Sequence, residues 1–325
     1  MFLSVIIPVY NAEKYISECL DSLIEQDIPS KDYEIICIDD GSIDESFDVM
    51  QKYAANYPNI KTVHQENAGV SVARNTGMDA AIGDYYWFVD SDDFVRENSL
   101  AKLKSICEQK KCDILSFRLF YFDDSESEML KKRLNAEETI SSNSIIRAQQ
   151  SMFISRELIG SQRWHPGVEV GEDSLFLREL MMKNPYVFEI DDTVYFYRQH
   201  SSSSIHSGGS STRRMISHVN GALIAKELYD SPGGHCEANA NLLRMFVIYA
   251  MVAIARNKSD QRTQALSLMR KADLFPFKMP KEATSKNNFH TNRTDLFGKV
   301  YGFLCTNSGS RIGQLLLRGY YRIRE

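Results

Sequence analysis

Short apolar runs alternate with amphipathic stretches along the first 122 residues of the chain. The apolar runs, which are typical of buried strands, cover residues 3–7, 33–38, 60–64, 85–89 and 113–122. Apolar residues recur at helical spacing over residues 12–24, with Asn11 as the predicted N-cap. A capping-box sequence at 42–45 predicts the start of a second helix, and further helices are predicted over 70–82 and 100–107. Strands and helices that alternate in this way predict a mostly parallel sheet with helices on both faces.

The pattern changes after residue 123, where helices become the main predicted element. Residues 123–145 are polar, a helix is predicted over 172–182, and a strand is predicted over 193–197. A break rich in Ser and Gly at 199–211 precedes predicted helices over 212–230, 236–256 and 260–272, a polar linker at 279–295 and a basic, aromatic tail. We therefore predict an α/β domain over residues 1–210 and a helical region over 211–325.

Composition and charge exclude several classes of protein. The 325 residues are 43% hydrophobic and 25% charged, as in ordinary globular proteins, and the net charge of -5 argues against nucleic acid as a partner. The six cysteines have no paired spacing, so we expect free, mostly buried thiols in a reducing compartment. The N-terminus does not read as a signal peptide, and no apolar run reaches the ~20 residues that a membrane span needs. We therefore expect a cytoplasmic protein.

Acidic residues follow one of the predicted strands directly. Asp90, Ser91, Asp92 and Asp93 come after the run at 85–89, and ligands of such sheets bind at the carboxyl ends of the strands. Crowded carboxylates repel one another, and a divalent cation such as Mn²⁺ or Mg²⁺ would offset that repulsion. The alternative is an acidic turn that caps the next helix.

Two other segments carry candidate chemistry at the same edge. Asp39 and Asp40 follow the strand at 33–38 and could accept hydrogen bonds from a nucleobase or a ribose, or form a turn with Ser42 as a cap. Residues 67–77 combine small side chains with Arg74, which suits contact with a phosphate or an acidic side chain. Close packing of a helix on the sheet explains the small residues equally well.

Together these motifs resemble family 2 glycosyltransferases with the GT-A fold. The matching segments are residues 4–13, 38–42, 67–77, 83–93 and 171–176. The resemblance implies a nucleotide-diphospho-sugar transferase fold, with a Rossmann-like, mostly parallel sheet flanked by helices. It also implies an inverting, metal-dependent transfer from a nucleotide sugar, a UDP-sugar in the first place, to a hydroxyl of a glycan or a lipid-linked saccharide. Mn²⁺ or Mg²⁺ is the implied cofactor.

The resemblance also assigns roles to residues. Asp173 is the implied catalytic base, and Asp92 is the implied metal ligand, with His200 or His206 as a second ligand. Glu172 is an implied acceptor contact. The implied donor-binding residues are Pro8, Val9, Tyr10, Glu13, Asp39, Asp40, Asn67, Arg74, Asp90, Ser91 and Arg198.

Some features leave alternatives open. Residues 149–158 lack the Trp and Lys that many relatives carry there; Trp164 lines the acceptor side instead or belongs to the core. The tail, with Arg311, Arg318 and Arg322 among apolar residues, suits peripheral contact with the inner face of the cell membrane or docking on protein. The alternative to an enzyme is a catalytically inactive scaffold or sensor that binds a nucleotide sugar.

Overall fold

The computed structural model describes residues 1–127, 130, 134, 149–200, 211–256 and 261–274. The chain divides into two compact units, each described by itself. The first unit comprises Met1–Pro166 and Leu180–Ser207, and the second comprises Gly167–Glu179 and Gly208–Glu325. The predicted domain boundary at 210, the linker at 279–295, the basic tail and His206 lie outside the described residues, so the predictions for them stay predictions.

The first unit is built on an eight-stranded mixed sheet with the order β3-β2-β1-β4-β7-β6-β8-β5. Neighbours among β1 to β4 are parallel, β7 is antiparallel to both β4 and β6, β6 and β8 are parallel, and β5 is antiparallel to β8. The strands are β1 (Leu3–Val9), β2 (Tyr33–Asp39), β3 (Ile60–His64), β4 (Tyr85–Phe88), β5 (Phe94–Val95), β6 (Ile114–Asp123), β7 (Met152–Ser155) and β8 (Val187–Gln199). This architecture confirms the predicted α/β class with strands flanked by helices.

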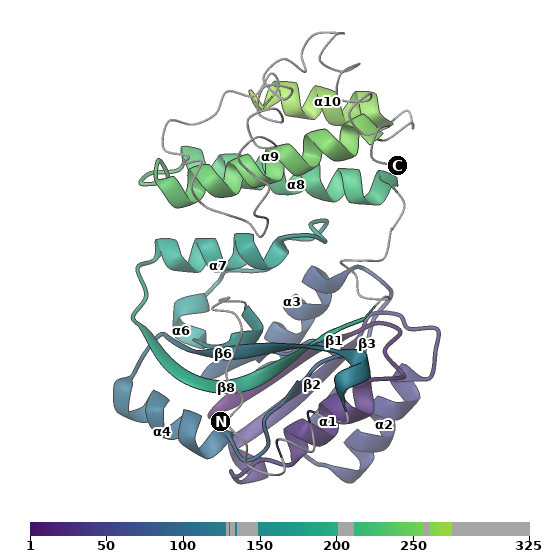
Figure 1. The fold of residues 1–325 in the computed structure, drawn as a ribbon, viewed down its shortest axis with the longest axis vertical. Coiled ribbons are helices and arrows are strands. Elements are labelled where there is room, and N and C mark those ends of the chain that lie inside the picture. Colours follow the sequence, from purple (N-terminus) through teal and green to yellow (C-terminus); the bar gives the residue numbers. More distant parts are fainter. Residues whose placement is uncertain (128–129, 131–133, 135–148, 201–210, 257–260, 275–325) are drawn as a thin grey trace. The chain divides into compact units, whose positions relative to one another are not determined.

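Helices cover both faces of this sheet, as Figure 1 shows. They are α1 (Ile16–Ile24), α2 (Ser46–Asn56), α3 (Val70–Ala80), α4 (Leu100–Lys110) and the short α6 (Arg156–Ile159), with 3-10 turns η1 (Ser30–Asp32), η2 (Asp124–Glu126) and η3 (Gln149–Ser151). Alternate strand residues such as Val5 and Ile7 share a buried cluster with Leu20 of α1 and Leu103 of α4. Cys19, Cys37, Cys107 and Cys112 are free and buried, as predicted.

Helix α3 packs close to the opposite face of the sheet. A Cβ atom at Gly77 would lie 2.4 Å from Cγ2 of Ile6 on β1, well inside van der Waals contact. A larger residue at position 77 would therefore push the helix off the strand. The close-packing interpretation accounts for at least this small residue in the segment 67–77.

Two predicted helix starts are wrong. Helix α1 begins at Ile16 rather than at residue 12, and α2 begins at Ser46 rather than at residue 43. Asn11 has a positive φ of 51°, and its side chain accepts a hydrogen bond from the backbone N–H of Ile43. Hydrogen bonds between these two loops therefore replace the predicted N-cap and capping box. The short strands β5 and β7 were not predicted, and β8 extends beyond the predicted 193–197.

The second unit is helical in its described part. It contains α8 (Ser211–Asp230), α9 (Glu237–Arg256), α10 (Gln261–Lys271) and the first residues of α7 (Glu172–Met182). Its core includes the buried side chains of Leu175, Met215, Phe246 and Met269. The predicted helices over 172–182, 212–230, 236–256 and 260–272 agree with these elements within one residue at each end.

Among the helices of the described residues, none combines the length and the apolar character needed to cross a membrane.

Candidate functional site

The carboxylate of Asp40 is held by protein donors at the end of β2. Its Oδ1 atom accepts hydrogen bonds from Gln65 Nε2 at 2.7 Å and from the backbone N–H of Ala68 at 2.9 Å. Its Oδ2 atom accepts from the backbone N–H of Gly69 at 2.9 Å, and its carbonyl accepts from Asn67 Nδ2. Asp40 therefore fixes the loop that leads into α3. A nucleobase that bonds Asp40, as predicted, would contact carboxylate oxygens that already accept hydrogen bonds from the protein.

Asp39 is fully buried and paired with a histidine that sequence reasoning did not single out. Its Oδ2 atom lies 2.6 Å from Nδ1 of His64 at the end of β3, and its Oδ1 atom accepts from the backbone N–H of Ser42. Gly41 completes the turn with a φ of 73°, where a Cβ atom would lie 2.8 Å from the backbone nitrogen of Asn67. The turn after β2 therefore needs glycine for its backbone and for its close approach to the next loop.

The loop after β1 is locked to the loop after β2. The backbone N–H of Asn11 donates to Ser42 Oγ at 3.0 Å, and the backbone N–H of Glu45 donates to Glu13 Oε2 at 2.9 Å. Pro8 and Val9 lie within β1, and the Tyr10 side chain that follows them is 53% exposed. Tyr10 therefore offers an accessible aromatic surface at this edge, whereas Glu13 joins the two loops.

Asp90 is held from two sides just after β4. Arg74 Nη2 donates to its Oδ1 atom at 3.0 Å, and Gln150 Nε2 donates to its Oδ2 atom at 2.7 Å. Its backbone N–H donates to the Tyr195 hydroxyl at 3.1 Å. Arg74 is 3% exposed and binds Asp90. Of the two predicted partners, a phosphate and an acidic side chain, the structure shows the acidic side chain.

Asp92 pairs with His200 at the end of β8. Its Oδ2 atom lies 2.8 Å from His200 Nε2, and the His200 ring packs on Tyr15 with centroids 4.9 Å apart. Burial, and then the charge of Asp90, raise the pKa of Asp92. The two residues predicted to bind a metal are therefore neighbours.

Asp93 is a structural acid rather than a solvent-facing one. It is 1% exposed, its Oδ2 atom accepts from the Tyr195 hydroxyl at 2.6 Å, and its Oδ1 atom accepts from the backbone N–H of Arg198 at 2.8 Å. Burial, and then the charges of Asp92 and Asp90, raise its pKa well above the ordinary value. Asp93 thus anchors the acidic turn to β8. Ser91, also predicted at the donor site, is partly buried.

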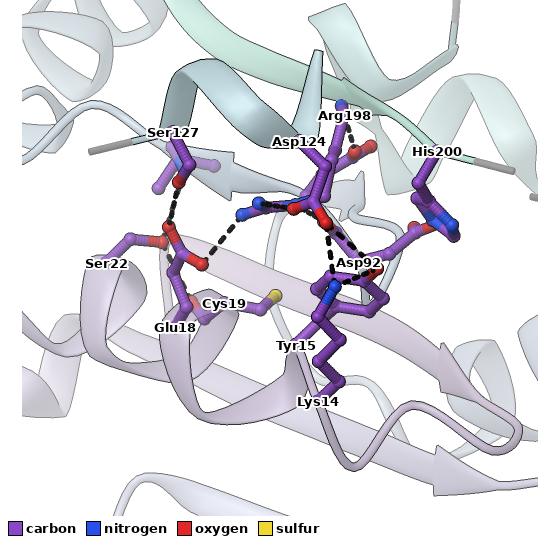
Figure 2. Close-up of polar contacts among 12 residues, drawn as sticks. Lys14, Tyr15, Glu18, Cys19, Ser22, Asp92, Asp124, Ser127, Arg198 and His200 are labelled. Carbon is purple, nitrogen blue, oxygen red and sulfur yellow. Dashed lines mark hydrogen bonds and ion pairs between the residues drawn. The ribbon is translucent and has the colours of Figure 1, made fainter. Parts of the chain in front are cut away.

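Arg198 is the centre of a charged network, which Figure 2 shows. Its Nη2 atom lies 2.7 Å from Glu18 Oε2 on α1, its Nη1 atom lies 2.6 Å from Asp124 Oδ1, and its Nε atom donates to the carbonyl of Asp92 at 2.8 Å. Lys14 forms a second ion pair with Asp124 at 2.7 Å. Because every guanidinium nitrogen has a protein partner and the residue is 2% exposed, this geometry supports a positioning role. The donor contact that the resemblance implies for Arg198 stays a prediction.

Replacing Arg198 with Met should lower the free energy of unfolding of the first unit by about 3 kcal/mol, because it leaves the partly buried Glu18 without a cation and leaves Asp124 with Lys14 alone. Both tryptophans, Trp87 and Trp164, lie in the first unit, so tryptophan fluorescence during urea unfolding reports on this unit alone. Arg118→Met is the matched control, since Arg118 pairs with Asp191, which is 91% exposed, and should cost no more than about 1 kcal/mol. Equal urea midpoints for the two variants would contradict the network.

Trp164 lies in the core of the first unit. It is 1% exposed, its ring meets Phe88 edge-on with centroids 5.0 Å apart, and the Arg74 guanidinium lies 4.5 Å from the ring centroid. The Asn75 side chain bonds both the N–H and the carbonyl of its backbone. These contacts favour the core interpretation over the predicted acceptor contact, because a packed ring has no open face for a sugar.

Glu172 and Asp173 open helix α7 and belong to the second unit. The Oδ1 atom of Asp173 accepts a hydrogen bond from the backbone N–H of Ser174 at 2.7 Å. Among the described residues no group donates a hydrogen bond to its Oδ2 atom, and the residue is partly exposed. The carboxylate therefore keeps acceptor capacity at the positive end of a helix.

Several residues that contact the predicted site residues were not identified from the sequence, because most of them are distant from those residues along the chain. These are His64, Gln150 and Tyr195, together with Glu18 and Asp124 around Arg198. His64 ends a predicted strand beside Asp39, and this was the one local signal. The other contacts join residues 60 to 180 positions apart, which no local pattern encodes.

Comparison with known proteins gives one consistent result. The sequence model described as Glycosyl transferase family 2 matches residues 4–184. The chain is 31% identical over 214 residues to "Uncharacterized glycosyltransferase EpsJ" of Bacillus subtilis, and the match covers 62% of each. It is 31% identical over 203 residues to the "Poly(ribitol-phosphate) beta-glucosyltransferase" of Bacillus spizizenii, covering 61% of this chain and 32% of that protein. The chain thus spans less than two thirds of these curated relatives.

A solved structure extends the comparison to the whole chain. The crystal structure of S. aureus TarS 1-349 in complex with UDP-GlcNAc superposes with a TM-score of 0.66 at 20% identity, covering 100% of this chain and 93% of that one. At this identity the likeness shows the fold alone, which is the GT-A fold predicted from the sequence.

Proposed function

The chain belongs to glycosyl transferase family 2, and from that membership we propose that it moves a sugar from a nucleotide sugar to a hydroxyl of an acceptor. We propose a UDP-sugar as the donor, a glycan or lipid-linked saccharide as the acceptor, and inversion at the anomeric carbon. The observation that carries this proposal is the set of acids at or just beyond the carboxyl ends of β2 and β4 in the first unit, Asp39 and Asp40 with Asp90 and Asp92.

The donor nucleotide is proposed to lie along this edge. The exposed Tyr10 side chain suits stacking on a base, and Asp39 and Asp40 sit at the adjoining end of β2. The TarS neighbour is described in complex with UDP-GlcNAc, which supports a uridine nucleotide here. Asp90, with both oxygens held by protein, would present a fixed carboxylate to the ribose.

A divalent cation, Mn²⁺ or Mg²⁺, fits Asp92 and His200. A carboxylate oxygen and an imidazole nitrogen are ligands that Mn²⁺ accepts, and the two side chains already lie in contact at 2.8 Å. Since the described ranges contain no group of three or more such ligands, water and the donor diphosphate would complete the shell. When bound, the cation supplies charge that stabilises the departing nucleoside diphosphate.

Asp173 is proposed as the base. Inversion in a single displacement needs one group that takes the proton of the acceptor hydroxyl while its oxygen bonds to the anomeric carbon and the nucleoside diphosphate leaves. One carboxylate oxygen of Asp173 has no hydrogen-bond donor among the described residues, which suits this role. Glu172, its neighbour in the first turn, is proposed to hold the acceptor.

A panel of nucleotide sugars, each with and without Mn²⁺, tests the proposed function. Calorimetry measures binding, and release of free sugar measures slow hydrolysis of the donor. We expect one donor, a UDP-sugar, to bind and to be hydrolysed only with metal. Binding without hydrolysis or transfer to any acceptor would favour the inactive scaffold, and no binding by folded protein would contradict the proposal.

A further inference from the structure

Gln150 reaches the acidic edge from an element that the sequence did not assign to the site. It belongs to η3, just before β7, and is 8% exposed. Its backbone carbonyl accepts a hydrogen bond of 2.6 Å from Nε1 of Trp87, a fully buried residue of β4. The backbone of Gln150 is therefore anchored in the core of the first unit by a residue of β4 that precedes Asp90 by three positions.

The side-chain amide of Gln150 has one possible orientation. An ionised carboxylate only accepts hydrogen bonds, so the amide atom 2.7 Å from Asp90 Oδ2 must be the nitrogen. Arg74 donates to the other oxygen of the same carboxylate at 3.0 Å. Asp90 is thus held between a cation and a neutral donor, and both interactions are stronger than ordinary hydrogen bonds because one partner is charged.

The neighbouring glutamine has no such contact. Gln149 is fully buried, and neither its amide nitrogen nor its amide oxygen has a hydrogen-bond partner in the described part of the chain. The side chains of these two adjacent glutamines are therefore alike in chemistry and both buried, but only the Gln150 side chain contacts Asp90. This difference separates a role at the site from a role in packing.

We propose that Gln150 is a positioning residue, which fixes the orientation of the Asp90 carboxylate for binding of the donor nucleotide. The inference rests on the proposed function, in which Asp90 faces the donor. Without the amide, Asp90 is held through one oxygen only and can rotate about its side-chain bonds, so part of the binding energy is lost in ordering it again.

The test compares Gln150→Met with Gln149→Met in the full chain. Methionine keeps the length and volume of glutamine but donates no hydrogen bond. Calorimetry with UDP, GDP and ADP, each with Mn²⁺, measures the dissociation constant. We expect Gln150→Met to weaken binding of the nucleotide by about 10-fold, the cost of ordering the freed Asp90 side chain on binding, and Gln149→Met to weaken it less than two-fold.

A double-mutant cycle asks whether Gln150 acts through Asp90. In an Asp90→Asn background, Gln150→Met should add less than two-fold to the loss, because the group that it positions is already changed. Additive losses, or equal losses for Gln149→Met and Gln150→Met, would overturn the inference, since they indicate an independent contact or general packing. If the wild-type protein binds none of the three nucleotides, the proposed function fails as well; if it binds and Gln150→Met binds equally well, this inference alone fails.

Discussion

Asp173→Asn should lower the turnover of sugar transfer by about 10³-fold while the dissociation constant for the donor nucleotide stays within two-fold of the wild-type value. A base that removes the acceptor proton contributes typically ~10²–10⁴-fold, and asparagine has the same shape but no basic oxygen. Donor binding is expected to persist because the proposed nucleotide contacts lie in the first unit, whereas Asp173 belongs to the second. Steady-state kinetics and calorimetry on one preparation measure both quantities.

The alternative is that Asp173 only complements the dipole of α7. An acidic residue in a first helical turn stabilises a helix by about 0.3–1 kcal/mol. Glu237 occupies the first turn of α9 in the same unit, so Glu237→Gln is a matched control that changes a comparable charge. We expect both variants to lose similar stability and Asp173→Asn alone to lose turnover. Full activity in Asp173→Asn, or loss of its donor binding, would remove the base assignment.

Asp92→Asn should lower transfer by about 10³-fold and remove the dependence of nucleotide binding on metal. A bound cation contributes several kcal/mol of charge stabilisation to a reaction, and about 4 kcal/mol corresponds to that factor. Asparagine keeps the size of the side chain and can still contact His200, but it supplies no negative charge to hold the cation. Initial rates over a range of Mn²⁺ concentrations, with calorimetry of UDP in Mn²⁺ and in chelator, measure the effect.

Asp84→Asn is the control for net charge. Asp84 immediately precedes β4, its side chain is 67% exposed, and it pairs loosely with Arg156 at 3.8 Å. The substitution changes the charge of the chain by the same amount as Asp92→Asn but at the opposite end of the strand. We expect wild-type rates and wild-type metal dependence in Asp84→Asn. Similar losses in the two variants would point to a general electrostatic effect and against a metal held by Asp92.

Local sequence pattern was sufficient for the parts of the fold that place the acids. The strands β1, β2 and β4 are apolar runs, and each run ends where its strand reaches the edge of the sheet. The carboxyl ends of parallel strands lie at the same edge. This geometry follows from strand direction alone, so the positions of Asp39 and Asp90 at strand ends were predictable. The short strands β5 and β7 were not, because two to four residues carry no measurable periodicity.

The electrostatics of the site depend on contacts that are distant in sequence. Arg198 follows the predicted strand at 193–197 and is predicted to contact the donor, yet Glu18 and Asp124 enclose its guanidinium group. Gln150 lies in a segment noted only for what it lacks, and it bonds Asp90. Such contacts form only when η2 and β8 meet the segment around α1 and when η3 meets the end of β4. The chemical type of a side chain does not reveal which partner the fold brings to it.

Electron paramagnetic resonance of Mn²⁺ tests the central claim, that this sheet edge binds a nucleotide sugar through a divalent cation, most directly. Free Mn²⁺ gives a six-line signal, so its loss measures the ion bound by the protein with and without UDP. The proposed site predicts weak binding of Mn²⁺ alone, one tightly bound ion per chain when UDP is added, and no such ion in Asp92→Asn. An unchanged signal on addition of UDP, together with UDP binding that is equally tight in chelator, would contradict it.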